Sequence, residues 1–473
     1  MRSNSAFPLI FTIFLVVCAA FVSPLQAQTT KGTVITVNDV GDTVDAAPRD
    51  GICADANGKC TLRAAIAESN ATAATDAIIF DIPVPATITL TLGELQITNP
   101  VGIFGRGARQ LTIQRTTTPN FSNFRVFYIT SSTQMRGLTI KNGNSFTSGG
   151  GILAAADVNL YDVAITGNNA RSGGGIAFQA SQESHSIMER CLINSNTASA
   201  QGGGMYIGAG TYPTVKSSTF TNNSAVTGGA VANYGGLTLA SDTIARNLAS
   251  QGGSSILSGT GGSVAIINTI IGPDIAQTVT SVEGSFNSRG FNIITNSTGS
   301  SGWTNDDQVT TNNAIDPLLG NLADNGGQTD SMALLSGSPA INRGDDCAVL
   351  FACPGYTMFE TAYDQRKFRR VAGGLTDIGA YESGSSANLN IYMIGLIFGR
   401  TQRLAFSRVT VTNTETMERR SSFIALWEPI QMREGSTRRM SFEWNGVYIA
   451  EINTKRGGLY SPTIYTLGGS SPF

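Results

Sequence analysis

The stretch LINSNTASAQGGGM at residues 192–205 contains the unit that decides the fold. It consists of a short apolar strand, an Asn shortly after it, and a glycine-rich step into another apolar residue. The same unit recurs five times between Leu138 and Ile256. The five copies are LTIKN with SGGGI, AITGNN with SGGGI, LINSN with QGGGM, TFTNN with TGGAV, and TIARN with QGGSSI.

The repeat has a period in the twenties. The apolar residues after the glycine step are 24, 29, 26 and 25 positions apart, and those in the strands are 24 to 28 positions apart. Such a period is typical of a solenoid, in which each repeat forms one coil. The first set is Ile152, Ile176, Met205, Val231 and Ile256, and the second is Ile140, Ile165, Ile193, Phe220, Ile244 and Ile270.

The residue types of the repeat indicate the kind of solenoid. Each unit is too short for a strand–helix–strand crossover, has no run with helical apolar spacing, and has fewer leucines than a leucine-rich repeat needs. Ile, Val and Thr suit pleated strands, whereas Gly and Asn tolerate left-handed turns. The sequence therefore predicts an all-β fold: a right-handed parallel β-helix with an N-terminal capping helix and a small C-terminal antiparallel β module.

In a parallel β-helix, equivalent positions of successive coils stack about 4.8 Å apart along the axis. Stacked Ile residues are then expected to form the core. The asparagines are expected to form a ladder at a turn, where each amide bonds to its neighbour and to the local backbone. The alternative is that Asn and Thr side chains line a groove for a carbohydrate. The ladder residues are Asn142, Asn168, Asn196, Asn223 and Asn247.

Short motifs within the repeat resemble a known family. GGGI ending at Ile152 and at Ile176, and FTNN ending at Asn223 with GGAV ending at Val231, resemble the GGA[IVL] and FxxN tetrapeptides of the polymorphic outer-membrane protein repeat. Five ordered occurrences make the resemblance specific. It implies an exported bacterial β-helix protein.

The composition fits stacked strands and argues against nucleic-acid binding. Charged residues make up 14% of the 473 residues, well below the usual quarter, and 54 residues are Gly. This balance suits strands and tight turns better than helical enzyme domains. The net charge of −2 predicts no basic surface for nucleic acid.

Residues 1–27 have the pattern of a secretory signal peptide. Arg2 precedes an apolar stretch from Leu9 to Val22, and cleavage is expected after Ala27. No later apolar run reaches the roughly 20 residues that span a bilayer. The protein is therefore expected to be secreted, extracellular, or associated with the outer membrane or cell surface, with no transmembrane helix after signal removal.

Two pairs of cysteines have spacings that suit local disulfides in an oxidising compartment: Cys53 with Cys60, and Cys347 with Cys353. Zinc is the alternative, but the two pairs lie far apart in the sequence and contain no C-x-x-C motif. Cys191 falls in the repeat and is expected to be buried. The sequence predicts neither a metal site nor a cofactor.

Residues 33–75 are predicted to cap the first coil. Within CTLRAAIAESN at residues 60–70, Thr61 can serve as the N-cap of a helix. With VITVNDVGDT and DGICADANGKC, this segment resembles the CSLREA domain of exported bacterial β-helix proteins, although Ala64 replaces the family's capping-box Glu. The helical face expected to pack on the first coil comprises Leu62, Ala65, Ile66 and Ser69.

Residues 76–315 are predicted to form the β-helix, with the clearest repeats at 138–271, and residues 316–383 to close its far end. DPLLGNLADNGGQTDSMALLSGSPAINRGDD, AYDQRKFRR and TDIGAYES resemble the choice-of-anchor Q module of exported bacterial β-helix proteins. Lys367 and Arg370 stand where that family usually has Gly and Pro. A charge cluster is expected to close the last coil as an ion-pair network, with catalysis as the alternative. Its members are Asp364, Arg366, Asp377 and Glu382.

Residues 384–389 are predicted to be a linker and residues 390–473 a C-terminal antiparallel β module. Strand-like runs in the module are separated by the turn signals Glu434-Gly435 and Asn445-Gly446. An attachment or sorting module and an inert sandwich both fit this segment.

Few residues suit catalysis. The single His, His185, lies in the loop SQESHSI, where the ordinary interpretation is a solvated side chain. An inverting glycosidase needs two carboxylates about 6.5 to 9.5 Å apart. Asp157, Asp162 and Asp242 form no recurring acidic pair along the repeat.

The function expected from these features is adhesion, or binding of glycan or matrix components, by a non-catalytic surface protein. Its partners would be polysaccharides or cell-surface and matrix components. The alternatives are a polysaccharide lyase or glycoside hydrolase on a β-helix scaffold, and a purely structural surface protein. Release of reducing ends or unsaturated uronates from polysaccharides distinguishes an enzyme from a binder.

Overall fold

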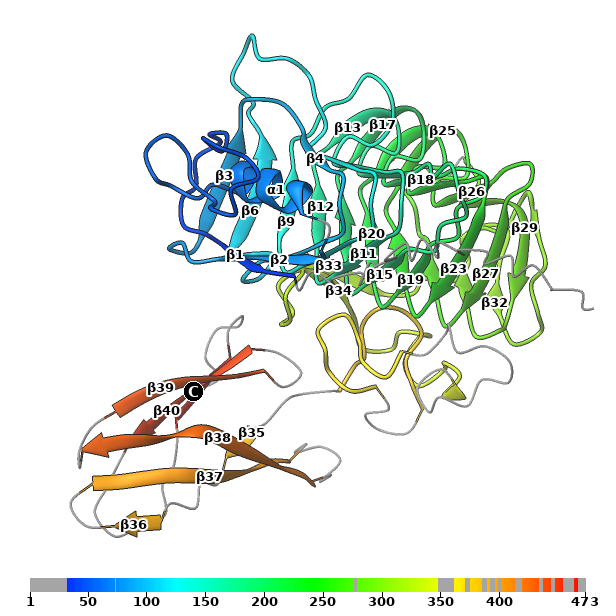
Figure 1. The fold of residues 1–473 in the computed structure, drawn as a ribbon. Coiled ribbons are helices and arrows are strands. Elements are labelled where there is room, and N and C mark those ends of the chain that lie inside the picture. The colour runs from blue at the N-terminus through cyan, green and yellow to red at the C-terminus, as the bar shows by residue number, and fades with distance from the viewer. Residues whose placement is uncertain are drawn as a thin grey trace, which may run out of the picture.

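The computed structural model describes residues 32–72, 74–275, 279–347, 361–370 and 375–384, together with the backbone of strands β35 to β41. The predicted signal peptide and Cys353 lie outside the described residues. The described chain forms a β-solenoid of parallel strands, followed by antiparallel strands near the C-terminus (Figure 1). The predicted all-β, parallel β-helix fold is confirmed.

Each regular coil, from β2 to β28, contributes one strand to each of three or four parallel sheets, which we call A to D. The chain passes from sheet A to sheet B and then to sheet C, and four consecutive coils insert a strand of sheet D between B and C.

Sheet A comprises β1 (Val34–Val37), β2 (Asp76–Phe80), β5 (Val101–Phe104), β8 (Thr133–Arg136), β11 (Val158–Tyr161), β15 (Ile187–Glu189), β19 (Thr214–Lys216), β23 (Gly236–Ala240) and β27 (Ser263–Ile267). Sheet B comprises β3 (Ala86–Leu90), β6 (Leu111–Arg115), β9 (Thr139–Lys141), β12 (Ala164–Thr166), β16 (Leu192–Asn194), β20 (Thr219–Thr221), β24 (Thr243–Ala245), β28 (Ile270–Ile271), β30 (Ile293–Ile294) and β32 (Gln308–Val309).

Sheet C comprises β4 (Leu95–Ile97), β7 (Phe127–Ile129), β10 (Ile152–Ala154), β14 (Ile176–Phe178), β18 (Met205–Ile207), β22 (Val231–Asn233) and β26 (Ile256–Ser258). Sheet D comprises β13 (Asn169–Ser172), β17 (Thr197–Gln201), β21 (Ser224–Thr227) and β25 (Leu248–Gly252). Near the far end, β29 (Val282–Ser288) pairs with β26, β27 and β31 (Ser300–Ser301), and so joins sheets C and A.

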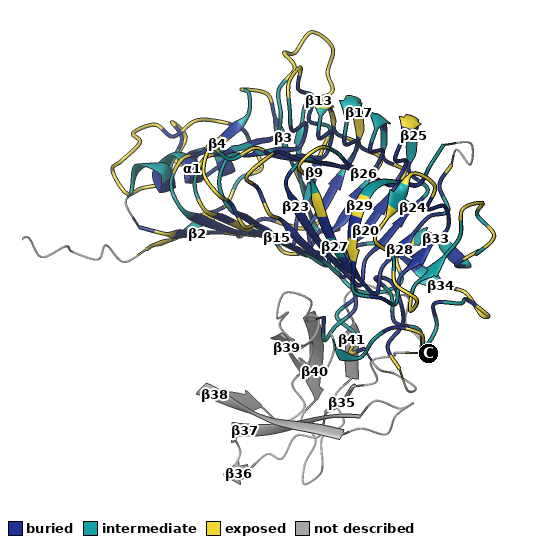
Figure 2. Cartoon of the chain, turned by 90° about the vertical axis from the view of Figure 1, so that its right-hand side faces the viewer, coloured by how far each residue is buried: buried dark blue, intermediate teal, exposed yellow. Residues whose placement is uncertain are grey.

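The core is a continuous stack of apolar side chains along the inside of the column. Ile165 pairs in register with Ile193, and Ile193 with Phe220, and all three are fully buried. Because side chains alternate in direction along a strand, their neighbours in the sequence point outward. Buried segments accordingly run the length of the column in Figure 2.

The repeated glycines allow successive coils to approach closely where sheet D passes to sheet C. A Cβ atom on Gly203 would lie 2.4 Å from the carbonyl oxygens of Gly229 and Ser224. Gly202, just before it, has a φ of 64°, in the left-handed region that favours Gly. The glycine motif therefore reflects both steric contact between coils and backbone conformation.

The first coil is capped by helix α1 (Leu62–Ala71). The hydroxyl of Thr61 accepts a hydrogen bond from the backbone N–H of Ala64 at 3.1 Å, as expected of an N-cap. Leu62, Ala65 and Ile66 pack into the main core, which confirms the predicted apolar face of the capping helix.

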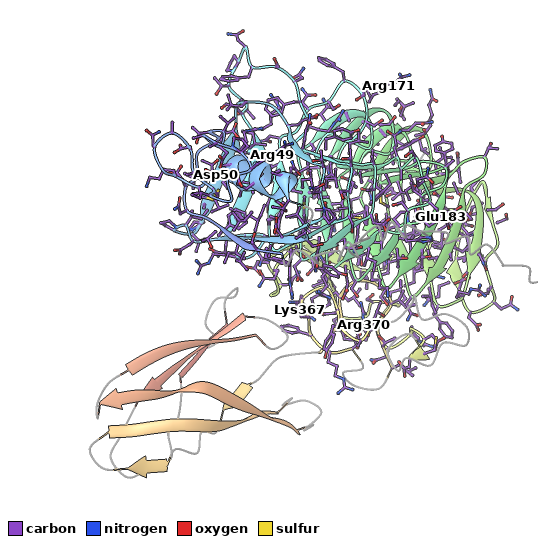
Figure 3. The ribbon with its side chains drawn as sticks, viewed as in Figure 1. Arg49, Asp50, Arg171, Glu183, Lys367 and Arg370 are labelled. Carbon is purple, nitrogen blue, oxygen red and sulfur yellow. A yellow bond between two sulfur atoms is a disulfide. The ribbon has the colours of Figure 1, made fainter. Side chains whose placement is uncertain are left out.

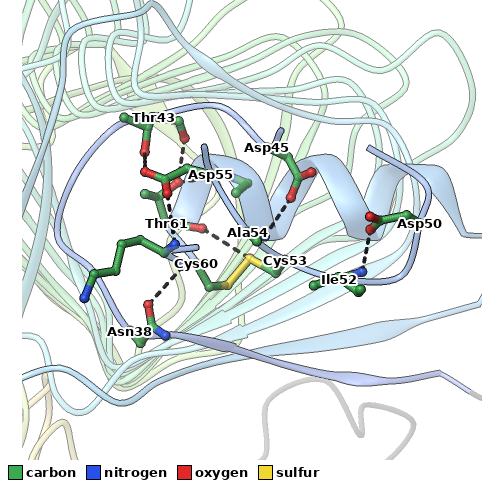
Figure 4. The surroundings of a disulfide bond; sticks show 12 residues. Asn38, Thr43, Asp45, Asp50, Ile52, Cys53, Ala54, Asp55, Cys60 and Thr61 are labelled. Atoms are coloured by element: carbon green, nitrogen blue, oxygen red, sulfur yellow. Dashed lines mark hydrogen bonds between the residues drawn. A yellow bond between two sulfur atoms is a disulfide. The ribbon is translucent and has the colours of Figure 1, made fainter. Parts of the chain in front are cut away.

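A disulfide between Cys53 and Cys60 closes the loop that leads into α1 (Figure 4). Buried Glu68 of the helix accepts hydrogen bonds from the backbone N–H groups of Arg49, at 2.8 Å, and Gly51, at 3.0 Å. The loop is thus attached to the helix at both ends, and the prediction of a disulfide at this site is confirmed.

At the far end of the column, the ring of Trp303 stacks on Phe286 with 4.8 Å between ring centroids. Phe286 is buried, and Trp303 packs against the main core. This tryptophan covers apolar side chains that the last coil would otherwise expose.

The described residues of 316–383, here called the flank module, pack along the outer face of sheet B. The module contains an antiparallel pair, β33 (Leu319–Ala323) and β34 (Ser331–Leu334). It contacts coils from Arg109, whose guanidinium bonds to Asp330 at 2.7 Å, to Gln308, whose side-chain amide donates to the carbonyl of Pro339 at 3.1 Å. These residues therefore cover a side of the column and reach its far end at β32, and their predicted role as a closing module stays a prediction.

The outer face of sheet B explains this position. Ala245, Ile270 and Ile293 form a buried apolar cluster with residues of the flank module. Strands with apolar side chains on both faces need a cover on both sides. The remaining members of the cluster are Leu319, Met332, Leu334, Ala340 and Ile378.

The C-terminal strands form two antiparallel sheets. In the first, β37 (Thr401–Thr412) pairs with β35 (Leu389–Ile391), β36 (Leu396–Phe398) and β38 (Arg419–Arg433). In the second, β40 (Val447–Asn453) pairs with β39 (Thr437–Glu443) and β41 (Thr463–Thr466). These strands confirm the prediction of a small antiparallel β module.

Candidate functional site

A shallow groove lies on the outer face of sheet A, across four neighbouring coils. It has a volume of about 220 Å³. Its floor comes from β19, β23, β27 and β29, and its wall comes from two loops that connect sheet C to sheet A. The lining consists of His185, Tyr212, Thr214, Gly236, Leu237, Thr238, Ser263, Val264, Ala265 and Asn287.

The wall of the groove is a pair of stacked rings. His185 and Tyr212 lie with their ring centroids 5.3 Å apart and their planes 20° apart. A Cβ atom on Gly236 would lie 2.4 Å from Cδ1 of Tyr212, so the ring can rest on the sheet only because this position is Gly. Tyr212 remains 41% exposed.

The two loops that carry the rings are held in place by backbone contacts. Asp157 accepts hydrogen bonds at 2.8 Å from the backbone N–H of His185 and from the hydroxyl of Ser184. The N–H of Tyr212 donates to the carbonyl of Ser184 at 2.8 Å. The ring pair is therefore part of an ordered surface, whereas the sequence suggested only a solvated His185.

The floor offers polar groups that the protein does not use. In the described structure, the side chains of Thr214, Thr238, Ser263 and Asn287 make no hydrogen bond. Thr214 pairs in register with Thr238, Thr238 with Ala265, and Ala265 with Asn287. Because paired residues of a sheet point to the same face, Thr214, Thr238 and Asn287 form a row on the side of the groove, and Ser263, which pairs with Gly236, lies beside that row. The two threonines are 8% and 9% exposed, so they form the bottom of the groove.

No Asp, Glu, Lys or Arg is among the groove-lining residues that the structure describes. A site of this kind can bind a ligand through ring stacking and neutral hydrogen bonds. Catalysis by paired carboxylates would need acidic side chains that the described lining does not provide.

The predicted asparagine ladder lies on the other side of the column, inside the turn between sheets B and D. Asn168 Nδ2 donates to Asn196 Oδ1, Asn196 Nδ2 to Asn223 Oδ1, and Asn223 Nδ2 to Asn247 Oδ1, each at 3.0 Å. All four residues are buried. Each amide also donates to a strand carbonyl, as Asn196 does to Ile165 at 2.9 Å.

Asn142 does not belong to this ladder, and its assignment is corrected. The equivalent position is Gly143, whose N–H donates to Asn168 Oδ1 at 2.8 Å. Asn142 has a φ of 60°, and its amide reaches Gln114 instead, at 3.0 Å. A side chain at position 143 is excluded because its Cβ would lie 1.9 Å from the carbonyl oxygen of Gly150.

The ladder ends in a residue that the sequence did not reveal. Asp274 Oδ1 accepts the N–H of Asn247 at 3.0 Å, and Ser255 donates its hydroxyl to the same carboxyl at 3.0 Å. Burial raises the pKa of Asp274 to about 7, against the lowering effect of these hydrogen bonds. An ionisable group therefore occupies the position of an amide.

A second polar ladder, which the sequence also did not reveal, occupies the turn between sheets A and B. The N–H of Ser218 donates to Asp242 Oδ1 at 2.8 Å, and the N–H of Asp242 donates to Thr269 Oγ1 at 3.3 Å. Burial raises the pKa of Asp242 to about 8. Asp242 therefore holds a turn inside the column and does not face the groove.

The predicted charge cluster is brought together, but on the flank of the column. Arg366 bonds to Asp364 at 2.6 Å and donates to the carbonyl oxygen of Glu382, also at 2.6 Å. The Glu382 carboxylate accepts the N–H of Asp377 at 3.0 Å and lies 3.6 Å from the guanidinium of Arg370. These side chains are almost fully buried, so they hold the flank module together and present no surface to a substrate.

Asp162 joins the flank module to the column. It bonds to Arg190 at 2.9 Å, Arg136 at 3.3 Å and Lys367 at 3.4 Å. Burial raises the pKa of Asp162, but the neighbouring cations outweigh burial and hold it below its ordinary value. Lys367 and Arg370 both lie on the flank module beside the column (Figure 3).

Two further observations concern the remaining cysteines and metals. Cys347 is disulfide-bonded, and Cys353, its predicted partner, lies outside the described residues. Cys191 is free and buried, as expected. In the part of the chain that the structure covers, no group of three or more His, Cys, Asp or Glu side chains could hold a metal ion.

Among the described helices, none is long and apolar enough to cross a membrane. Comparisons with protein-family models, curated proteins and solved structures found no match to the chain.

Proposed function

We propose that this chain is an exported β-helix protein of the cell surface or extracellular space that binds glycan or matrix components without transforming them. The observation that carries the proposal is the sheet A groove. It combines an exposed ring pair with a row of hydrogen-bonding groups that have no partner in the described protein, and no acidic residue is among its described lining residues.

Features of the sequence support export. The pattern of residues 1–27 is that of a signal peptide, and the Cys53–Cys60 disulfide suits an oxidising compartment. The resemblances to the CSLREA domain, the polymorphic outer-membrane protein repeat and choice-of-anchor Q all point to exported bacterial β-helix proteins. We assign adhesion or matrix binding to the column, and attachment or sorting to the C-terminal module.

A binding screen of the mature chain from Gln28, with and without residues 387–473, tests the proposal. The screen pairs a glycan array with a polysaccharide panel that is assayed for reducing ends and unsaturated uronates. Retention on glycans without product release is the expected result, and it should survive removal of the C-terminal module. Product release would instead support the lyase or hydrolase alternative, and retention on nothing in the screen would refute glycan binding.

A further inference from the structure

We propose that the sheet A groove takes a neutral polysaccharide, laid along the axis of the column with one pyranose ring against Tyr212. This inference rests on the glycan binding proposed above. It adds the class of glycan, the direction in which it lies, and the residues that hold it.

The charge of the groove selects a neutral glycan. The described lining provides no Lys or Arg to pair with a uronate or sulfate group, and the imidazole of His185 already lies 3.1 Å from the carboxylate of Glu183. An anionic polysaccharide would lose hydration there without gaining a cation. The hydroxyls of a neutral sugar can instead donate to, or accept from, Thr, Ser and Asn side chains.

The spacing of the floor sets the direction of the ligand. Thr214, Thr238 and Asn287 face outward in one register row that crosses β19, β23, β27 and β29, with Ala265 between the last two polar positions. Neighbouring strands lie about 4.8 Å apart, close to the length of one sugar unit in an extended glycan. Successive sugars of a chain along the axis would therefore meet successive coils.

Tyr212 provides the apolar contact. The aliphatic face of a pyranose ring packs well on an aromatic ring, while the sugar hydroxyls remain free for hydrogen bonds at the rim. Tyr212 stands beside the polar row, because it precedes Thr214 by two residues along the strand direction and rests on Gly236, two residues before Thr238. One sugar can thus stack on the ring while the next ones reach the floor.

Affinity electrophoresis and titration calorimetry of the full chain test this assignment, with xyloglucan and galactomannan as neutral probes and polygalacturonate and alginate as acidic probes. The neutral probes are expected to bind, with little change between about 0.1 and about 1 M salt because no ion pair is involved. Tyr212→Ala should weaken binding about tenfold or more, whereas Tyr212→Phe should stay within about threefold of the native chain.

Two further variants sharpen the test. Thr238→Val keeps the shape of the floor but removes one hydroxyl, and should weaken binding by about three- to tenfold. Tyr206→Ala is the matched control, because Tyr206 is an outward tyrosine of the same coil on sheet C, paired with Tyr234 at 5.7 Å and outside the groove. It should leave binding unchanged.

Binding of the acidic probes alone, or neutral binding that Tyr212→Ala leaves intact, would overturn this inference while leaving glycan binding in place. Failure of every probe and of the array to bind would overturn both proposals.

Discussion

Replacing Asn196 with Leu is expected to destabilise the column strongly. The Asn196 side chain is fully buried and takes part in four hydrogen bonds: two from Asn168, one to Ile165 and one to Asn223. Leu has a similar size but can make none of them, so polar groups of three residues lose a partner inside the protein. At about 1 kcal/mol for each bond, the free energy of unfolding should fall by about 4 kcal/mol.

Urea denaturation at neutral pH, followed by circular dichroism, measures this change. Asn169→Leu is the matched control, because Asn169 directly follows the ladder residue Asn168, is exposed, and its side chain makes no hydrogen bond in the described structure. The control should change the free energy of unfolding by less than about 0.5 kcal/mol. Equal stabilities of the two variants would refute the view that the amide ladder stabilises the column.

Three further predictions follow from the packing of the coils. Burial raises the pKa of Asp274 from 3.8 to about 7, so the native chain should lose stability as the pH rises from about 4 to 7. Asp274→Asn should remove this loss, and its free energy of unfolding at pH 8 should exceed that of the native chain by about 4 kcal/mol. Urea curves of the two proteins that differ equally at pH 4 and pH 8 would contradict this prediction. Gly203→Ala should lower the melting temperature by several degrees, because its Cβ would lie 2.4 Å from two backbone oxygens. Gly320→Ala is the control and should lower it much less, because its nearest atom would lie at 3.3 Å. Replacing both Cys53 and Cys60 with Ser should lower the local stability of α1 by about 2 kcal/mol. Hydrogen exchange in α1 should then be faster than in the native chain, while exchange in the central coils stays the same. Unchanged exchange in α1 would argue against a stabilising disulfide.

The fold was predictable because the same pattern of strand, Asn and glycine-rich turn recurs in several copies. The residues after the glycine step, such as Ile152 and Ile176, pair in register in the structure as their spacing suggested. The capping helix was also predictable from the sequence, since the Thr61 N-cap and the apolar face around Ile66 are local features. Local signals and exact periodicity carry over from sequence to structure with little dependence on distant contacts.

Positions that differ by one residue between copies were less predictable. In the first copy the order is Asn142-Gly143, and in the second it is Gly167-Asn168, so only one of the two asparagines occupies the ladder position. The spacing of the motif tolerates such a shift, whereas the stacked turn does not. A comparison of which copy has Gly at the left-handed position could have revealed the difference.

The place of the flank module and the groove could not be read from spacing. The spacing placed Ile270 in the inward series, but Ile271 pairs with Ile244 instead and Ile270 joins the cluster on the outer face of sheet B. The segment that covers this face lies more than a hundred residues after Leu192, which is also apolar and outward. The groove depends on Tyr212 resting on Gly236 of the following coil. Contacts of this kind arise from how coils of unequal loop length stack, and no single repeat contains them.

The most direct test of glycan binding at the groove is hydrogen–deuterium exchange of the full chain with and without a bound neutral polysaccharide. Slower exchange is expected in peptides that cover the two loops of the wall and strands β19, β23 and β27, with no change in sheet D. Protection confined to sheet D, the flank module or the C-terminal strands would contradict a binding site on sheet A.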